Sequence, residues 1–356
     1  YSFDNQSKLW KPTSYFPIGQ LYPERTDSYE VGLATKWLKG KLTFDATIYQ
    51  TNTYNQTIFV KSSGSSGYTG SYAQTGDVRN RGYEIGLGYN ANLSEKIGWN
   101  SYFTISYNQN RIMKLIENEI DPTTGKKYDT DYLEKNGLGG LTYLLRTGGT
   151  LGDVYTKNDF RRDSNGNIMV DANGNVNIDD FKNISEYKKL GSVLPDYNLG
   201  WRNDFSIGNF NIGAMLTGRI GGVVVSMTQG ALDNYGVSKA SADARDAGGV
   251  YNNGVKINPQ NYYTTLGKAL APQYYTYSAT NFRLQEAYIS YKLPRKFINN
   301  QMDLTFSVIG RNLLMIYAKA PFDPEAVSST GNYSQGLDYF MMPSLRSFGI
   351  NVKANF

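Results

Sequence analysis

The chain has 356 residues, with 36 Lys and Arg against 31 Asp and Glu, and it contains no Cys and no His. The lack of Cys excludes disulfides, thiolate nucleophiles and Cys-ligated metals within these residues. The lack of His removes the commonest general base and metal ligand, which excludes most hydrolase, zinc and non-haem iron sites. The net charge of +5 is mild and the basic residues are dispersed, so we expect no nucleic-acid partner.

Apolar and polar residues alternate with a period of two along much of the chain, which predicts β-strands rather than helices. In residues 197–207 only Asn203 interrupts the apolar face. Several runs reach the ~9–11 residues that a tilted strand needs to cross a bilayer. Such strands fit either a soluble β-sandwich or a membrane barrel with a water-filled lumen. The nine long strands predicted in this way lie around residues 29–37, 42–48, 83–89, 99–107, 197–207, 210–216, 287–293, 304–308 and 348–356.

The connections between these strands alternate between short and long. Bacterial outer-membrane barrels join their strands by short periplasmic turns and long outer loops, whereas structureless loops beyond ~12–15 residues are uncommon in soluble domains. The sequence therefore predicts an all-β chain that forms a transmembrane antiparallel β-barrel in the bacterial outer membrane. The short connections are residues 38–41, 92–97, 208–209 and 294–301, and the long ones are roughly residues 60–72, 117–192, 227–277 and 318–343.

The odd number of strands predicts a barrel larger than this chain. If the last strand ends in the periplasm, nine strands place residues 1–26 outside the cell. Complete barrels of this class have an even strand count and both ends inside. We therefore expect residues 1–356 to be the C-terminal portion of a larger barrel whose N-terminal strands are absent from this chain.

Five regions of the chain, in order, resemble motifs of one transporter family. They are residues 23–33 (PERTDSYEVGL), 76–84 (GDVRNRGYE), 190–197 (LGSVLPDY), 281–294 (NFRLQEAYISYKLP), and a closing region with residues 310–314 (GRNLL), 322–326 (FDPEA), Tyr339 and 343–348 (PSLRSF). Each pattern is weak by itself. Together, in family order and with compatible spacing, they resemble the SusC/RagA-type TonB-dependent transporters of Bacteroidota outer membranes. The chain departs from that family in containing no plug domain and no TonB box.

This resemblance implies a barrel of ~22 strands, of which the chain supplies about the last nine, and it implies no cofactor. It implies active import of a bulky nutrient, either an oligosaccharide or a peptide. A SusD-like surface lipoprotein would act as a lid, and TonB would supply energy through the plug domain. The barrel would do no covalent chemistry, so we do not expect an enzyme. A passive porin and a surface carbohydrate-binding β protein are the alternatives.

The polar faces of the predicted strands supply candidates for the lining of the channel. Glu84, Arg202, Asp204 and Arg219 face the lumen in this scheme, so they are candidates for the substrate path. The alternative is that these charges pair across neighbouring strands and hold the lumen wall together.

Tyrosine is abundant, with 30 residues. Amphipathic rings gather at both membrane interfaces, so we expect Tyr at the strand ends to form girdles. A second group lies in a predicted outer loop, and its members are candidates for ligand or partner contact, with packing of the loop on itself as the alternative. This group is Tyr262, Tyr263, Tyr274, Tyr275 and Tyr277. Residues 227–277 and 318–343 mix Tyr with Asn, Gly and Asp, which suits recognition of the lipoprotein.

Two similar Asp-x-Asn-Gly-Asn segments begin at Asp163 and Asp171. Oxygen side chains at alternate positions make these two residues, with Asn165 and Asn173, weak calcium candidates. The EF-hand spacing fails, because Gly and Glu do not stand at the positions where that loop needs them. The favoured interpretation is two Asn-Gly turns of a small hairpin with residues 168–170 as the strand between them, so no metal site is predicted.

The chain ends in an amphipathic strand whose last residue is aromatic. Phe348, Ile350, Val352 and Phe356 share its apolar face. This ending resembles the C-terminal signal that barrel-assembly machinery recognises, which would make that machinery a partner. An ordinary aromatic residue on a final strand is the alternative, and the two are compatible.

Overall fold

The computed structural model describes residues 2–4, 9–11, 15–16, 22–61, 70–120, 124–135, 137–172, 174–252, 255–298, 302–329 and 335–356. Its long strands are β4 (Arg25–Trp37), β5 (Leu42–Lys61), β6 (Gly70–Ser94), β7 (Ile97–Lys114), β16 (Tyr197–Ile207), β17 (Phe210–Ile220), β22 (Asn281–Leu293), β23 (Asp303–Ala318) and β25 (Ser347–Asn355). Within the described residues these nine form one antiparallel sheet in the order β25-β23-β22-β17-β16-β7-β6-β5-β4, and β3 (Tyr15–Phe16) adds in parallel to β6. The nine predicted strands and their barrel-like order are confirmed.

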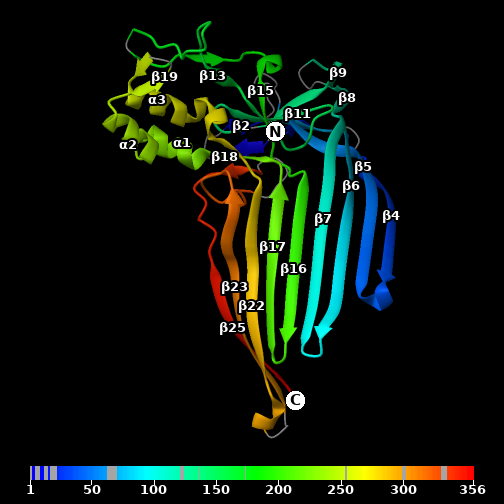
Figure 1. Ribbon diagram of the computed structural model, residues 1–356. Coiled ribbons are helices and arrows are strands. Elements are labelled where there is room, and N and C mark those ends of the chain that lie inside the picture. The colour runs from blue at the N-terminus through cyan, green and yellow to red at the C-terminus, as the bar shows by residue number, and fades with distance from the viewer. Residues whose placement is uncertain are drawn as a thin grey trace.

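Figure 1 shows these strands as a curved wall with its long connections at one end, the loop end, and its short turns at the other, the turn end. The short turns are residues 38–40, 95–96, 208–209 and the segment after β22, which contains the 3-10 turn Arg295–Ile298. Gly208 begins a two-residue turn with φ 58, a conformation that favours glycine. The C-terminus lies at the turn end. The predicted alternation of short and long connections is confirmed, although residues 62–69 of the first long one lie outside the described residues.

The long connections are folded segments, with more short strands and helices than the one small hairpin that the sequence predicted. Their elements have two to eight residues, too few for an alternation pattern to reveal. Between β7 and β16 lie β8 (Ile116–Ile120), β9 (Lys127–Thr130), β10 (Tyr132–Lys135), β11 (Leu141–Arg146), β12 (Asp153–Thr156), β13 (Asn158–Phe160), β14 (Ile178–Asp180) and β15 (Lys188–Ser192). Between β17 and β22 lie β18 (Val223–Ser226), α1 (Met227–Asn234), α2 (Lys239–Asp246), β19 (Val250–Asn252), β20 (Val255–Ile257), α3 (Pro259–Thr265) and β21 (Thr276–Ser278). The remaining short strands are β1 (Ser2–Asp4), β2 (Leu9–Lys11) and β24 (Leu337–Asp338).

Each of the three α-helices begins at a residue whose side chain caps it. The Ser226 hydroxyl accepts a hydrogen bond from the Gln229 N–H, and Ser238 and Asn258 do the same for α2 and α3. Such caps satisfy backbone donors that the first helical turn leaves unpaired. Among the described residues no helix is long and apolar enough to cross a bilayer.

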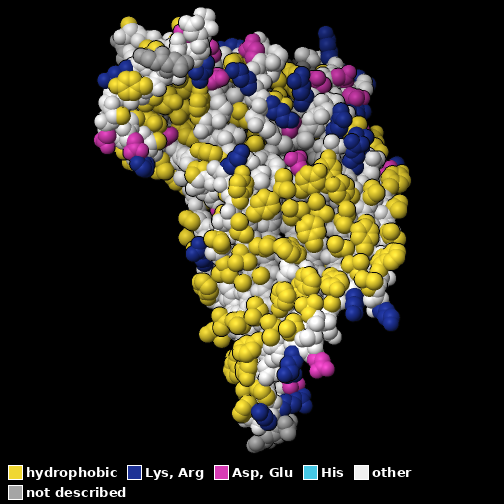
Figure 2. Space-filling view, in the orientation of Figure 1, with side chains coloured by type: hydrophobic (Ala, Val, Ile, Leu, Met, Phe, Trp, Pro, Cys, Tyr) yellow, Lys and Arg dark blue, Asp and Glu magenta, His cyan; other side chains and the backbone are white. Residues whose placement is uncertain are grey.

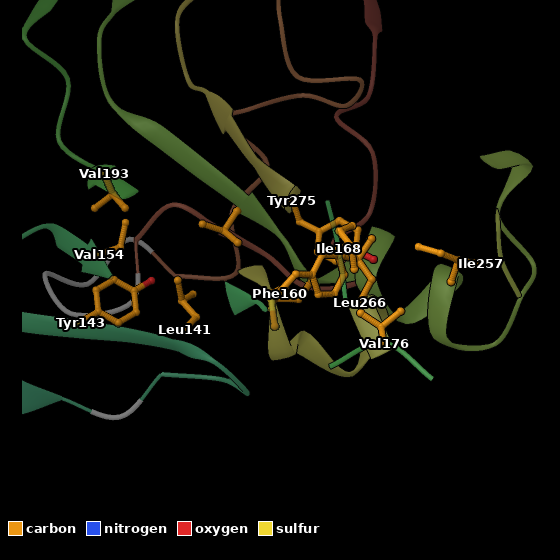
Figure 3. Packing of buried hydrophobic residues seen from close by; sticks show 13 residues of the cluster. Leu141, Tyr143, Val154, Phe160, Ile168, Val176, Val193, Ile257, Leu266 and Tyr275 are labelled. Atoms are coloured by element: carbon orange, nitrogen blue, oxygen red, sulfur yellow. The ribbon is translucent and has the colours of Figure 1, made fainter. Parts of the chain in front are cut away.

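The largest buried hydrophobic cluster lies in the folded outer loops and not in the wall. It joins residues of β11, β12 and β13 to residues of α1 and the segment around α3, and Figure 3 shows their side chains from close by. Leu141, Val154 and Phe160 are its contributions from the first connection, and Leu266 and Tyr275 come from the second. Two connections far apart in sequence therefore share one core above the wall.

Alternation sorts the side chains of the wall onto an apolar outer face and a polar inner face. On β4, which is paired on one side only among the described residues, Val31 is 77% exposed, and within the sheet Trp201 is 44% exposed. Figure 2 shows hydrophobic side chains across the middle of the wall, with Lys, Arg, Asp and Glu gathered toward its ends. An exposed apolar band of this extent is typical of a surface that meets lipid.

Aromatic side chains form two rows on the outer face, as expected for membrane girdles. On β16, Tyr197 and Phe205 are eight residues apart, which is ~26 Å along the strand and ~20 Å of height at a tilt of about 40°, close to the ~25 Å apolar band of such barrels. One row is Tyr83, Tyr107 and Tyr197, with neighbouring ring centroids 5.4 and 5.2 Å apart. The other row is Tyr89, Trp99 and Phe205, with neighbouring ring centroids 5.4 and 6.0 Å apart.

Asn203, the residue that interrupts the apolar face of β16, has a partner there. The Trp99 indole N–H of β7 donates to the Asn203 Oδ1 at 3.2 Å, and both side chains are partly buried. This bond satisfies part of a polar amide that would otherwise face lipid alone. The interruption is therefore a paired polar group within the band.

We expect Trp99→Phe to lower the free energy of unfolding of the full-length barrel by about 1–2 kcal/mol, because it leaves the Asn203 amide without its donor in an apolar setting. Chemical unfolding in lipid vesicles measures this loss. Trp99→Phe should cost much less in a background that already has Asn203→Leu, since no polar group is then left unpaired. An equal loss in both backgrounds would show that the indole bond contributes nothing.

Candidate functional site

Charged side chains on the inner face of the wall pair across the strands. Arg202 of β16 donates from Nε to the Asp204 Oδ2 at 2.9 Å, and its guanidinium lies 5.9 Å from the centre of the Tyr288 ring on β22. The Tyr288 hydroxyl donates to the Asp204 Oδ1 at 2.8 Å. Two strands that are not neighbours, β16 and β22, are thus connected above the strand between them.

The same set of contacts continues to β23. The Arg311 Nε donates to the Glu286 Oε2 at 3.0 Å, and the Glu286 Oε1 lies 4.0 Å from the Arg202 Nη1. We call these five residues, Arg202, Asp204, Glu286, Tyr288 and Arg311, the inner-wall network. It contains two cations and two carboxylates, so its formal charge is zero. Each exposed ion pair is worth little by itself, but a network fixes several side chains in one arrangement.

Gly213 of β17 makes the contact between β16 and β22 possible. It lies opposite Asp204 on one side and opposite Tyr288 on the other. A Cβ at this position would lie 2.1 Å from the Tyr288 Cε1 and 2.4 Å from the Asp204 Oδ1. No side chain fits there, so a glycine is needed for Tyr288 to reach Asp204 across β17.

The other two predicted lumen residues lie apart from this network. Glu84 is exposed on β6 and lines a hollow of about 480 Å³ on the inner face with Asp45 and Asn198, and it forms no ion pair within the described part of the chain. Arg219 lies at the loop end of β17, where its Nη2 donates to the Val193 backbone oxygen at 2.6 Å. Arg202 and Asp204 pair with each other along β16, and not across neighbouring strands as the alternative had it, while a place in the substrate path stays a prediction for all four.

The sequence reasoning did not name Gly213, Glu286, Tyr288 or Arg311, although it contained a signal for three of them. Glu286 and Tyr288 stand on the polar phase of β22, and Arg311 lies within β23 on the polar phase of that strand. Extending the alternation of those two strands to these positions would have identified the three residues as inner-face residues. Gly213 gives no such signal, because its role depends on two side chains from neighbouring strands.

The tyrosines of the second outer connection pack largely against other residues of the outer loops. Tyr275 is 3% exposed and its hydroxyl donates to the Asp233 Oδ2 at 2.7 Å, which with burial raises its pKa. Tyr262 and Tyr274 pack on Phe160 with ring centroids 5.6 and 5.1 Å away, and burial raises the pKa of Tyr262 to about 12. For Tyr275 the expectation of outer contact was wrong, since the ring is enclosed by the loop core.

The two remaining members of that group have neighbours within the loops as well. The Tyr263 ring meets Tyr262 edge-on at 5.1 Å, and the Tyr277 hydroxyl donates to the Gln229 Oε1 at 2.6 Å. Both are partly exposed, so contact with a ligand or partner stays a prediction for them.

The Asp-x-Asn-Gly-Asn segments form two similar turns. The Asp163 Oδ1 accepts from the Asn165 and Asn167 N–H groups at 2.9 Å each, and the Asn167 side chain donates to its Oδ2 at 3.0 Å. The side-chain bond from Asn167 is the main cause that holds the pKa of Asp163 below its usual value. Asp171 and Asn175 repeat these contacts, while Asn173 lies outside the described residues. The turns are confirmed, while residues 168–170 form only isolated bridges, Ile168 to Arg162 and Val170 to Val176, and not the predicted strand. No group of three or more acidic residues that could hold a metal ion occurs in the described ranges.

The C-terminal strand presents its apolar residues outward. Phe348, Ile350, Val352 and Phe356 are all exposed, and β25 pairs with β23 from Asn355 to Ser347. This geometry places the alternating pattern at the free edge of the sheet. Recognition of these residues by barrel-assembly machinery stays a prediction.

A family model described as the TonB-dependent receptor-like β-barrel matches residues 3–217, which is more than half of the chain. The chain belongs to this family of TonB-dependent receptors. Among curated relatives, TonB-dependent receptor P3 of Formosa agariphila is 24% identical over 317 residues, which cover 81% of this chain and 30% of the relative. TonB-dependent receptor P39 of the same organism is 26% identical over 137 residues, which cover 38% of this chain and 12% of the relative.

Solved structures give the same fold assignment. The chain is similar to the RagAB peptide importer in its closed-closed state, with a TM-score of 0.68 and 15% identity over 94% of this chain and 35% of that chain. A second RagAB structure, described as a peptide transporter, matches with a TM-score of 0.65 over the same shares. The predicted SusC/RagA-type resemblance is confirmed, and the chain spans about a third of the length of receptor P3 and of the RagAB chains that it matches.

In this TonB-dependent barrel we expect Gly213→Ala to lower the free energy of unfolding by about 1–3 kcal/mol, because the new methyl group displaces Tyr288 from Asp204. Unfolding of the full-length protein in lipid tests this. Gly98→Ala is the matched control, since its Cβ would meet its nearest neighbours at 3.6 and 3.7 Å. Removing the ring by Tyr288→Ser should abolish most of the additional cost of Gly213→Ala. A cost that persists in this double variant would place the effect elsewhere.

Proposed function

We propose that the full-length protein is an outer-membrane importer of a bulky nutrient, with residues 1–356 as the C-terminal portion of its barrel. The wall itself supports this proposal most directly. Its outer face is an exposed apolar band, and its inner face bears charged and hydroxyl groups around a hollow of about 480 Å³. A lipid-facing exterior and a polar interior suit the passage of a hydrophilic solute.

The substrate class in this proposal is an oligosaccharide or a peptide. The RagAB structures that this chain resembles are described as a peptide transporter and a peptide importer, which supports the peptide class. On the inner face Glu84 and Asp45 are exposed carboxylates with no ion pair among the described residues, whereas the charges of the inner-wall network neutralise one another. The β5–β6 part of the wall would therefore favour a solute with a positive group.

The proposed partners meet the barrel at its two ends. A SusD-like surface lipoprotein would contact the folded outer loops, where Tyr235, Val237 and Tyr251 are large apolar side chains exposed above the wall. TonB would act from the periplasm through a plug domain outside residues 1–356. Membership of the TonB-dependent receptor family supports energy-coupled import over a passive porin. The exposed apolar band argues against a soluble carbohydrate-binding protein.

We expect Glu84→Lys to change the rate of nutrient uptake by about fivefold, because reversing one unpaired charge on the path shifts the interaction with a charged solute by about 1 kcal/mol. Uptake of labelled peptides and oligosaccharides by cells that produce the full-length protein measures it. The amount of protein in the outer membrane should not change, since Glu84 supports no ion pair within the described residues.

Glu95→Lys is the control, because it makes the same change of charge in the turn between β6 and β7. Uptake by the parent protein should also stop when a protonophore collapses the inner-membrane proton gradient. Uptake that continues without the gradient would identify a passive porin and end the proposal of TonB-dependent import.

A further inference from the structure

The upper part of β23 lacks a neighbouring strand on one side. β25 pairs with β23 only between Asp303 and Arg311, whereas β22 pairs with it as far as Ala318. Residues 341–346 run beside this upper part without forming a strand. We call the space between Asn312–Ala318 and residues 344–346 the seam. Its strand edge offers backbone N–H and C=O groups that the sheet does not use.

A backbone bulge and two hydrogen bonds keep the seam open. Asn312 adopts φ 51 at a bulge of β23, where one extra residue turns the strand away from its straight course. The Asn312 Nδ2 donates to the Leu345 backbone oxygen at 3.3 Å, and the Ser344 hydroxyl donates to Asp323 of the loop that follows β23. Residues 344–346 are therefore held toward that loop, and a hollow of about 560 Å³ remains between them and Ile316.

Among the described residues that line the seam, Arg346 carries the charge that has no compensation, and that charge is positive. The Asp323 carboxylate on its lining is neutralised, because Arg283 donates to its two oxygens at 2.7 and 3.2 Å and the Glu325 N–H donates at 3.0 Å. Arg346 also lines the seam and is exposed, and it makes no ion pair or hydrogen bond within the described residues. An anionic group would find its complement here.

The position of Arg346 along the membrane normal matches the level of lipid head groups. At the turn end, Lys292 and Arg295 pair with Asp303 at 3.3 and 2.6 Å and mark the periplasmic boundary of the wall. Asn312 lies beside Arg346 and follows Asp303 by nine residues on β23. This separation corresponds to ~30 Å along the strand and ~23 Å of height at a tilt of about 40°. That height is close to the ~25 Å apolar band, so Arg346 lies at its outer boundary.

We propose that the seam binds a phosphate-bearing anionic lipid of the outer leaflet, with the phosphate on Arg346 and an acyl chain along the exposed outer face of β25. Phe348 and Ile350 continue from Arg346 directly into the apolar band, so the head group and the chain meet suitable surfaces in sequence. The free N–H groups of the β23 edge add donors for the phosphate and glycerol oxygens. A strand of the same protein could pair with the free edge of β23, but it would leave the positive charge of Arg346 unneutralised. The charge therefore favours a lipid as the occupant of the seam.

The experiment uses the full-length protein in a Cys-free background, because residues 1–356 contain no Cys of their own. Phe348→Cys places a fluorophore beside Arg346, at the lower end of the seam where the acyl chain would lie, and Ile212→Cys places the same fluorophore on the lipid-facing part of β17. Vesicles of phosphatidylcholine with increasing fractions of brominated phosphatidylglycerol then quench each fluorophore. We expect the seam position to reach half-quenching at a much lower phosphatidylglycerol fraction than position 212, which reports the bulk lipid.

Arg346→Gln should raise the half-quenching fraction at the seam about tenfold, the factor that corresponds to a loss of about 1.4 kcal/mol. Arg295→Gln is the matched control, with the same loss of charge at the turn end, and should leave it unchanged. Half-quenching at the seam that does not respond to Arg346→Gln would overturn the proposal. A seam fluorophore that no lipid quenches, while position 212 is quenched normally, would also overturn it and would indicate that another segment of the protein covers the seam.

Discussion

A strand that crosses a bilayer finds no water for its backbone, so each of its N–H and C=O groups depends on the strand beside it. This constraint explains why β16 is paired along its whole length, from Tyr197 to Ile207, with both β7 and β17. It also explains where irregular structure occurs. The helices and short strands gather beyond the ends of the wall, where water can bond to their backbones. Within the wall, the backbone departs from regular pairing at bulges such as the one at Asn312 of β23, and the side chains are mainly apolar outward and polar inward.

A wall one sheet thick has no hydrophobic core of its own, so its side chains must bind neighbouring strands to one another. On the inner face the network from Arg202 to Arg311 does so across β16, β17, β22 and β23, and it needs the missing side chain of Gly213. Charges that the wall does not use in this way, such as Glu84 on the inner face and Arg346 at the outer boundary, are the candidates that we propose for binding other molecules. Charges that are paired within the wall therefore support its structure, and unpaired charges are the candidates for binding.

The alternation of residues was enough to predict the nine strands, since burial on one side only imposes a period of two over ten or more residues. The alternation of connection lengths was enough to predict the ends of the wall. Neither signal reaches the outer loops, where Tyr275 is buried by residues from a connection more than a hundred positions earlier, such as Phe160. Nor could the sequence place Tyr288 beside Asp204, because that contact crosses an intervening strand and depends on register.

The central claim is that alternate residues of one strand face lipid and lumen, and the labelling of single cysteines on β16 tests it most directly. Asn198→Cys and Ser206→Cys lie on the inner face, and Leu199→Cys and Ile207→Cys on the outer face. In a Cys-free full-length protein in vesicles, a water-soluble maleimide should label the first pair rapidly and the second pair slowly. A lipid-soluble quencher should act on a fluorophore at the second pair and spare the first. Equal labelling of neighbouring positions would contradict a membrane-spanning wall.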